Sequence, residues 1–182
     1  MKKKSNFVWV IKIVLISIAA SMAFTFASTE ILGRAGYPVA FALLAVFIAV
    51  GIVFDVIGIA VAAASEAPFH SMASRREHGA AESLRLLRSA DRVASFCNDV
   101  VGDVTGIVSG TTAALIAARL MEGLNAANIL FPLLISGCVT GLTIGGKAAG
   151  KAMAIRKSTA IVHSVGKLIS ALRPKTATPK NK

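Results

Sequence analysis

Residues 93–118 read VASFCNDVVGDVTGIVSGTTAALIAA, an apolar stretch that also carries Asp99 and Asp103. A helix that crosses the hydrocarbon of a membrane needs about 20 mainly apolar residues, and this stretch is longer than that. Carboxylates inside such a helix are costly, so they are usually paired or serve a function. The stretch therefore predicts a transmembrane helix with a polar site within it.

Three further apolar stretches extend over about residues 7–29, 38–65 and 126–146. Of the 182 residues, 55% are hydrophobic and only 16% are charged, and the mean hydropathy is +0.71. Roughly a quarter of the residues in an ordinary soluble domain are charged, so this chain is too apolar for that class. We expect an all-α integral membrane protein with about four transmembrane helices.

The 20 Lys and Arg residues are concentrated in three segments. Four lie within the first 12 residues, five lie between residues 66 and 92, and nine follow residue 146, whereas the other two connections contain only Arg34 and Arg119. Because Lys and Arg are enriched in cytoplasmic loops, we expect a multi-pass protein of the plasma membrane with both termini in the cytoplasm. Contact with membrane lipids then accounts for the net charge of +11, and nucleic acid is not an expected partner.

Two segments between and after the spans are amphipathic. Residues 66–92 and 155–172 form helical patterns with apolar side chains along one face, namely Ala80, Leu84 and Leu87 in the first and Ile161, Val165, Leu168 and Leu172 in the second. Helices of this kind lie in the plane of the membrane surface. We expect both segments to be juxtamembrane helices on the cytoplasmic side.

The chain divides into three parts. Residues 1–37 are expected to form a membrane helix and an outer loop; their MKKK start is signal-like, but the apolar run is long for a signal peptide and an uncleaved helix is favoured. Residues 38–172 are expected to form the main transmembrane domain. The basic segment 173–182 is polar and contains proline, which predicts a disordered tail.

Polar residues of three spans occur at similar depths. At 1.5 Å per residue, Asp55 and Asp103 each lie about 16 Å from the cytoplasmic boundary and Asp99 about 10 Å from it. We therefore expect one pocket between the second, third and fourth spans, lined by these aspartates and Asn98. Glycines at every fourth position favour close helix packing there; they are Gly102, Gly106, Gly110, Gly137, Gly141 and Gly145.

The chemistry of this pocket leaves alternatives open. Carboxylate and amide oxygens are ligands that suit Mg²⁺, as a bound or a transported ion. A structural ion pair with Lys12 or Lys147 is the alternative for any one aspartate. No nucleophile–base pair is apparent in the sequence, so we do not expect an enzyme.

Four segments together suggest a family. AAASEAPFHSMASRRE (62–77), ESLRLLRSADRVAS (82–95), FCNDVVG (96–102) and GGKAAGKAMA (145–154) follow one another in an order that resembles the transmembrane domain of the cyclin M / CorC magnesium exporters. The resemblance implies a dimeric helical domain whose polar pocket holds Mg²⁺. A separate cytoplasmic protein would supply the regulation that additional domains provide in that family.

The resemblance also assigns residues. Ser65 and Glu66 match a Ser-Glu motif and Asn98 matches an asparagine of the family, whereas Lys147 stands where the family has an acidic residue. The complete set of candidate metal ligands is Asn98, Asp99, Asp103, Asp55, Ser65 and Glu66. We expect a small membrane protein of the divalent-cation exporter type that binds or transports Mg²⁺. The alternative is a non-transporting membrane subunit or regulator that binds a partner protein.

Overall fold

The structure is a computed structural model that describes residues 2–124 and 130–172. The expected tail at 173–182 and the first residues of the fourth expected span lie outside this part of the chain. Its elements, in order, are α1 (Lys2–Arg34), α2 (Tyr37–Ala63), α3 (Ala67–Ser74), α4 (Ala80–Arg88), α5 (Ala90–Ser95), the π-helix η1 (Phe96–Gly102), α6 (Asp103–Leu124), α7 (Leu130–Arg156) and α8 (Ser158–Leu172).

Four helical stretches are long and apolar enough to cross a membrane. They are Val8–Arg34, Tyr37–Ala63, Ala90–Glu122 and Leu130–Arg156. The third stretch joins α5, η1 and α6 end to end. The prediction of an all-α membrane protein with four such helices is confirmed, and the described residues form no strand.

The fourth helix is longer than its apolar part. Its predicted end at residue 146 is wrong, because α7 continues to Arg156. The added segment KAAGKAMAIR is rich in alanine, lysine and methionine, which favour helix. Lys147 therefore lies within a helix that packs in the bundle, instead of at its end.

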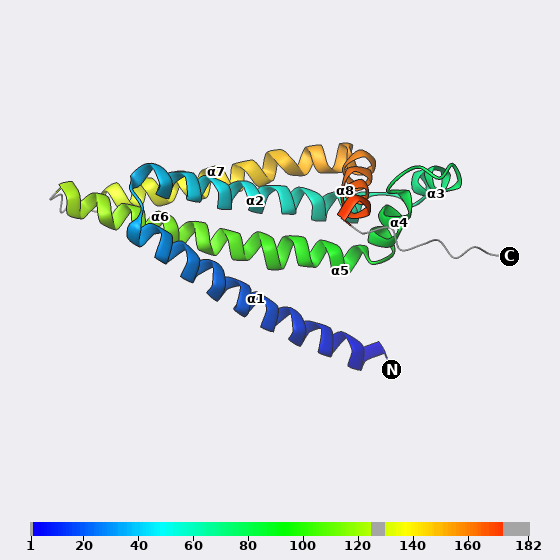
Figure 1. Cartoon of the computed structure of the whole chain (residues 1–182), viewed down its shortest axis with the longest axis horizontal. Helices are drawn as coiled ribbons and strands as arrows, with labels where there is room; N and C mark the ends of the chain where they lie inside the picture. Colours follow the sequence, from blue (N-terminus) through cyan, green and yellow to red (C-terminus); the bar gives the residue numbers. More distant parts are fainter. Residues whose placement is uncertain (1, 125–129, 173–182) are drawn as a thin grey trace.

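Helix α2 lies at the centre of the bundle and contacts α6, η1 and α7 (Figure 1). It is apolar on nearly all sides but buried on only part of its surface, since Val39, Val46 and Val53 are each about half exposed. Helix α1 packs mainly on α6 and diverges from the bundle toward its own N-terminus (Figure 1). Near the C-terminal end of α1, a buried hydrogen bond of 2.8 Å between the hydroxyls of Ser28 and Thr112 joins α1 to α6.

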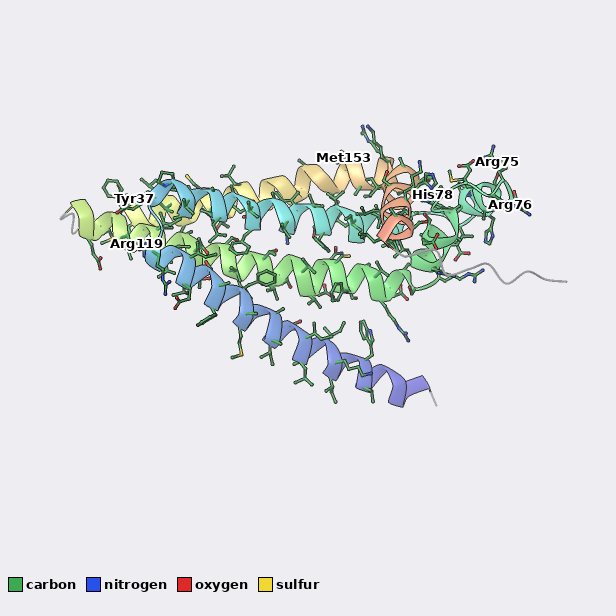
Figure 2. The ribbon with its side chains drawn as sticks, viewed as in Figure 1. Tyr37, Arg75, Arg76, His78, Arg119 and Met153 are labelled. Atoms are coloured by element: carbon green, nitrogen blue, oxygen red, sulfur yellow. The ribbon has the colours of Figure 1, made fainter. Side chains whose placement is uncertain are left out.

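The two ends of the bundle differ in character. Tyr37 and Arg119 mark one end, where the Tyr37 hydroxyl donates a hydrogen bond of 3.2 Å to the carbonyl of Arg119 (Figure 2). The start of α1, the α3–α4 segment and α8 lie at the other end (Figure 1). The described parts of the three Lys- and Arg-rich segments therefore share one end, which is the arrangement that the charge distribution requires.

The two amphipathic segments pack against each other. Gly79, which has a φ of 87°, precedes α4 and directly contacts the backbone of α8 at Lys167. A Cβ atom on Gly166 would lie 2.5 Å from the Gly79 carbonyl oxygen. The buried Ser83 hydroxyl links the helices by donating to the carbonyls of Gly79 (2.9 Å) and Val162 (3.2 Å). Two glycines thus allow the backbones to meet.

This crossing determines which faces are buried. The apolar face predicted for α4 packs inside the protein, where Ala80, Leu84 and Leu87 are all buried. On α8 the residues buried against α4 are Val162 and Gly166, whereas Leu168 and Leu172 of the predicted apolar stripe are 61% and 75% exposed, as a face turned toward a membrane surface would be in the isolated chain. The absence of a side chain at Gly166 explains which face of α8 meets α4, since only that face admits the backbone of α4.

Candidate functional site

The segment FCNDVVG forms a π-helix between α5 and α6. A π-helical turn contains an extra residue and often occurs at functional sites. At its junction with an α-helix, some backbone carbonyls are left without a backbone N–H partner. Here the Thr105 hydroxyl donates to the carbonyls of Val101 (2.7 Å) and Gly102 (3.1 Å). Thr105 is buried against Gly51 of α2, where a Cβ atom would lie only 2.6 Å from the Thr105 hydroxyl oxygen. The close approach of α2 therefore depends on Gly51.

Asn98 projects from η1 toward α2. It lies directly against Gly58, where an added Cβ atom would be 2.9 Å from Asn98 Cγ and 3.0 Å from the Cβ of Cys97. Asn98 Oδ1 is buried and has no hydrogen-bond partner among the described residues. Buried acceptors of this kind are rare, because each one loses its hydration without compensation. This atom is therefore a candidate ligand atom.

An ion pair involves the same face of α2 as Gly58, the residue that Asn98 contacts. Lys147 Nζ on α7 is 3.9 Å from Asp55 Oδ1 on α2, and the two side chains are 26% and 15% exposed. The same Nζ lies 3.5 Å from the position of a Cβ atom on Gly102 of η1. The structural ion pair weighed for Lys147 is thus present, with Asp55 as its partner.

Glycines bring α7 close enough for this pair to form. Gly146 directly contacts Ile52, and a Cβ atom on Gly150 would lie 2.6 Å from Val56 Cγ2. Both contacts are made between α7 and α2 on either side of Lys147. They place the ammonium group where α2, η1 and α7 meet.

Asp99 and Asp103 lie on another side of the same helix. Both are exposed, and together with Ser17 and Ser21 of α1 they line an open cavity of about 360 Å³. Neither carboxylate has a hydrogen bond or an ion pair with any described residue, and Lys12 forms no ion pair with either of them. The one pocket expected from depth is therefore divided: Asn98 and Asp55 face the α2–α7 side, and Asp99 and Asp103 face α1.

Ser65 and Glu66 occupy the corner between α2 and α3. The Ser65 hydroxyl accepts a hydrogen bond of 3.5 Å from the Ala67 backbone, and Glu66 Oε2 lies 3.4 Å from His70 Nε2. Ser65 follows Gly58 by seven residues, which corresponds to about 10 Å along the helix axis. These two residues are not brought to Asn98, and the described part of the chain contains no cluster of three or more His, Cys, Asp or Glu residues that could hold a metal ion.

The glycines that mediate packing are mostly not those expected. Of the six predicted, only Gly102 has neighbours within 4 Å of a built Cβ atom; Gly106, Gly110, Gly137, Gly141 and Gly145 have none. Contacts between α2, η1 and α7 instead depend on Gly51, Gly58, Gly146 and Gly150. Glycine thus does allow close helix packing, but at these four positions and not at five of the six predicted ones.

Two site residues were missed in the sequence. Ser17 and Ser21 face Asp99 and Asp103 across the cavity between α1 and α6. The sequence contained a signal for them, since Ser17, Ser21, Thr25 and Ser28 recur at helical spacing on one face of an otherwise apolar helix. The last of these is the residue that bonds to Thr112.

No family model matches this sequence, and no curated protein or solved structure matches it either. The resemblance to the cyclin M / CorC family therefore stays a prediction that rests on four short motifs.

Proposed function

We propose that the protein is a small membrane protein of the divalent-cation transporter type that binds hydrated Mg²⁺ at Asp99 and Asp103. The observation that carries this proposal is the pair of carboxylates, one helical turn apart, which share a cavity with two hydroxyl groups and have no partner among the described residues. Two negative charges balance one divalent cation.

The donor set and the cavity both suit this ion. Mg²⁺ is commonly held by one or two carboxylates while it keeps several of its water molecules. A cavity of about 360 Å³ has room for such a hydrated ion, since one water occupies about 30 Å³. The serine hydroxyls can accept or donate hydrogen bonds to the retained waters.

Within a membrane, a bound cation would stabilise these two carboxylates. A carboxylate near the centre of a transmembrane helix costs about 2.5–3.5 kcal/mol, and two adjacent carboxylates also repel each other. A bound cation removes both penalties. The divergence of α1 from α5 leaves this side of η1 with a less tightly packed neighbour than the α2–α7 side (Figure 1).

The proposal predicts that MgCl₂ stabilises the purified protein and that Asp99→Asn/Asp103→Asn abolishes this effect. At ten times the dissociation constant a ligand adds about 1.4 kcal/mol to the free energy of unfolding. Thermal unfolding over a series of MgCl₂ concentrations measures the effect, and Mg²⁺ uptake into liposomes with an enclosed indicator measures transport. Ser65→Ala/Glu66→Gln is the matched control and should respond like the wild type. An unchanged response in the Asp99→Asn/Asp103→Asn variant would show that the site is elsewhere.

A second candidate function is that of a membrane subunit which binds a partner helix. It is favoured by the face of α7 that carries Gly137, Gly141 and Gly145, none of which has a neighbour within 4 Å of a built Cβ atom. Small residues at every fourth position let a second helix approach closely. The predicted homodimer would supply such a helix from a second copy of this chain.

Cys138 offers a direct test of the homodimer. It is exposed on α7 and shares a helical face with Gly141 and Gly145. Contact between two copies through this face predicts that mild oxidation in the membrane produces a disulfide-linked dimer. Cys138→Ser and Gly141→Leu should each prevent the dimer, whereas Cys97→Ser should not, because Cys97 is buried. A wild-type protein that stays monomeric under these conditions rules out self-association through this face.

A further inference from the structure

The ammonium group of Lys147 lies at a junction that carries two other polar groups. Asp55 is its ion-pair partner, and the buried Asn98 Oδ1 has no hydrogen-bond partner among the described residues. Asn98 contacts Gly58, which is three residues from Asp55 on α2 and therefore shares its helical face. The α2, η1 and α7 segments thus each contribute one polar group to the region where they pack, and Asn98 Oδ1 accepts no hydrogen bond from Lys147 Nζ.

We propose that Lys147 is a tethered cation: its ammonium group stands in for a monovalent cation that Asp55 and the unpaired Asn98 Oδ1 would bind between α2, η1 and α7. The charges support a monovalent ion. Asp55 contributes one negative charge and Asn98 contributes a neutral oxygen, so a single positive charge makes the site neutral. Asp99 and Asp103 face the cavity beside α1 and belong to a separate site, so this inference does not depend on the proposed function.

The geometry indicates that the ammonium group is held by charge and not by a directional bond. The Nζ–Oδ1 distance of 3.9 Å is beyond the 2.7–3.2 Å of a hydrogen bond. Lysine is also a flexible point charge that can move its head group toward water. A small metal cation with oxygen ligands can therefore take the place of the ammonium group when that group is absent.

Lys147→Met tests this inference, because methionine retains the bulk of the side chain and removes its charge. The melting temperature of the variant is expected to fall by about 5 °C or more in choline chloride, whose cation is too large for the site. Added NaCl at constant ionic strength should restore it with a saturable dependence. The wild type should respond to neither salt, and Asp55→Asn/Lys147→Met should be insensitive to NaCl. Asp99→Asn/Asp103→Asn should leave the NaCl response of Lys147→Met unchanged.

Chemical restoration of the charge gives a second measurement. In a Cys138→Ser background, Lys147→Cys can be alkylated with 2-bromoethylamine, which rebuilds an ammonium side chain of nearly the length of lysine. Alkylation is expected to abolish the NaCl response of this variant, with Cys138→Ser alone as the control.

Four outcomes would overturn the inference. They are a Lys147→Met protein that is folded in choline chloride but does not respond to NaCl, one that is recovered folded in neither salt, one that responds to MgCl₂ but not to NaCl, and a wild type with the same NaCl response as the variant.

Discussion

Asp55→Asn is expected to lower the free energy of unfolding by about 3 kcal/mol, since it leaves the ammonium group of Lys147 without its counter-charge inside the bundle. The substitution keeps the size and shape of the side chain, so packing against α7 is retained and the loss reports the charge. Unfolding of the purified protein in detergent, followed by circular dichroism during titration with a denaturant, measures the change.

Removal of both charges provides the control for this prediction. Replacing a buried ion pair by neutral groups of similar volume is often close to neutral, whereas removing one partner is not. Asp55→Asn/Lys147→Met should therefore recover most of the stability that Asp55→Asn loses. A double variant that is less stable than either single variant would mean that the two side chains stabilise the bundle through contacts other than their mutual attraction.

Gly58→Ala is expected to lower the free energy of unfolding by about 2 kcal/mol or more, although alanine is the better helix former. The added methyl group would occupy the space of Asn98 Oδ1 and lie 3.0 Å from the Cβ of Cys97. Either α2 must move away from η1 or the π-helical turn must change. Thermal unfolding and the denaturant titration both measure the result.

The same change on another helix supplies the matched control. Gly141→Ala on α7 meets no atom within 4 Å, so it should leave the free energy of unfolding unchanged or raise it by up to about 1 kcal/mol. Asn98→Ala should relieve part of the Gly58→Ala defect, since it removes the atoms that the methyl group meets. If Gly58→Ala proved as harmless as Gly141→Ala, the close contact between α2 and η1 would not exist in the folded protein.

The number of long helices could be predicted because each is an apolar run of the length that hydrocarbon requires. Their ends were less predictable where hydropathy and helix propensity disagree. Residues 147–156 are too polar to extend an apolar run, yet they are strong helix formers, so α7 continues through them. This is why Lys147 was expected at a membrane boundary and is found at a junction of three segments.

Depth along a helix could also be predicted, but direction around its axis could not. Asn98 and Asp99 are adjacent in the sequence and lie at almost the same depth, yet one faces α2 and the other faces α1. The π-helical turn contributes to this separation, and FCNDVVG contains no proline or other local signal that would announce it. Depth alone therefore predicts one pocket that holds Asn98 and all three aspartates, because it does not distinguish the sides of a helix.

The glycines of α7 illustrate the same limit. Gly145 and Gly146 are neighbours, so the sequence contains two overlapping patterns of small residues at four-residue spacing. The longer pattern, which includes Gly137, Gly141 and Gly145, predicts the wrong contact face. The bundle uses Gly146 and Gly150, because these point toward Ile52 and Val56 of α2.

The hydrogen bond between Ser28 and Thr112 fixes α1 to α6 near the C-terminal end of α1, so a tilt of α1 about this point moves its N-terminal part the most. Ser17 precedes Ser28 by 11 residues, which is about 16 Å along the axis. A tilt of α1 by about 5° about the Ser28–Thr112 hydrogen bond moves Ser17 by about 1.4 Å relative to Asp99 and Asp103. In the proposed Mg²⁺ site the Ser17 hydroxyl bonds to a water that the ion retains, and such hydrogen bonds are kept only at about 2.5–3.0 Å, so a small tilt of one helix is enough to make or break this contact.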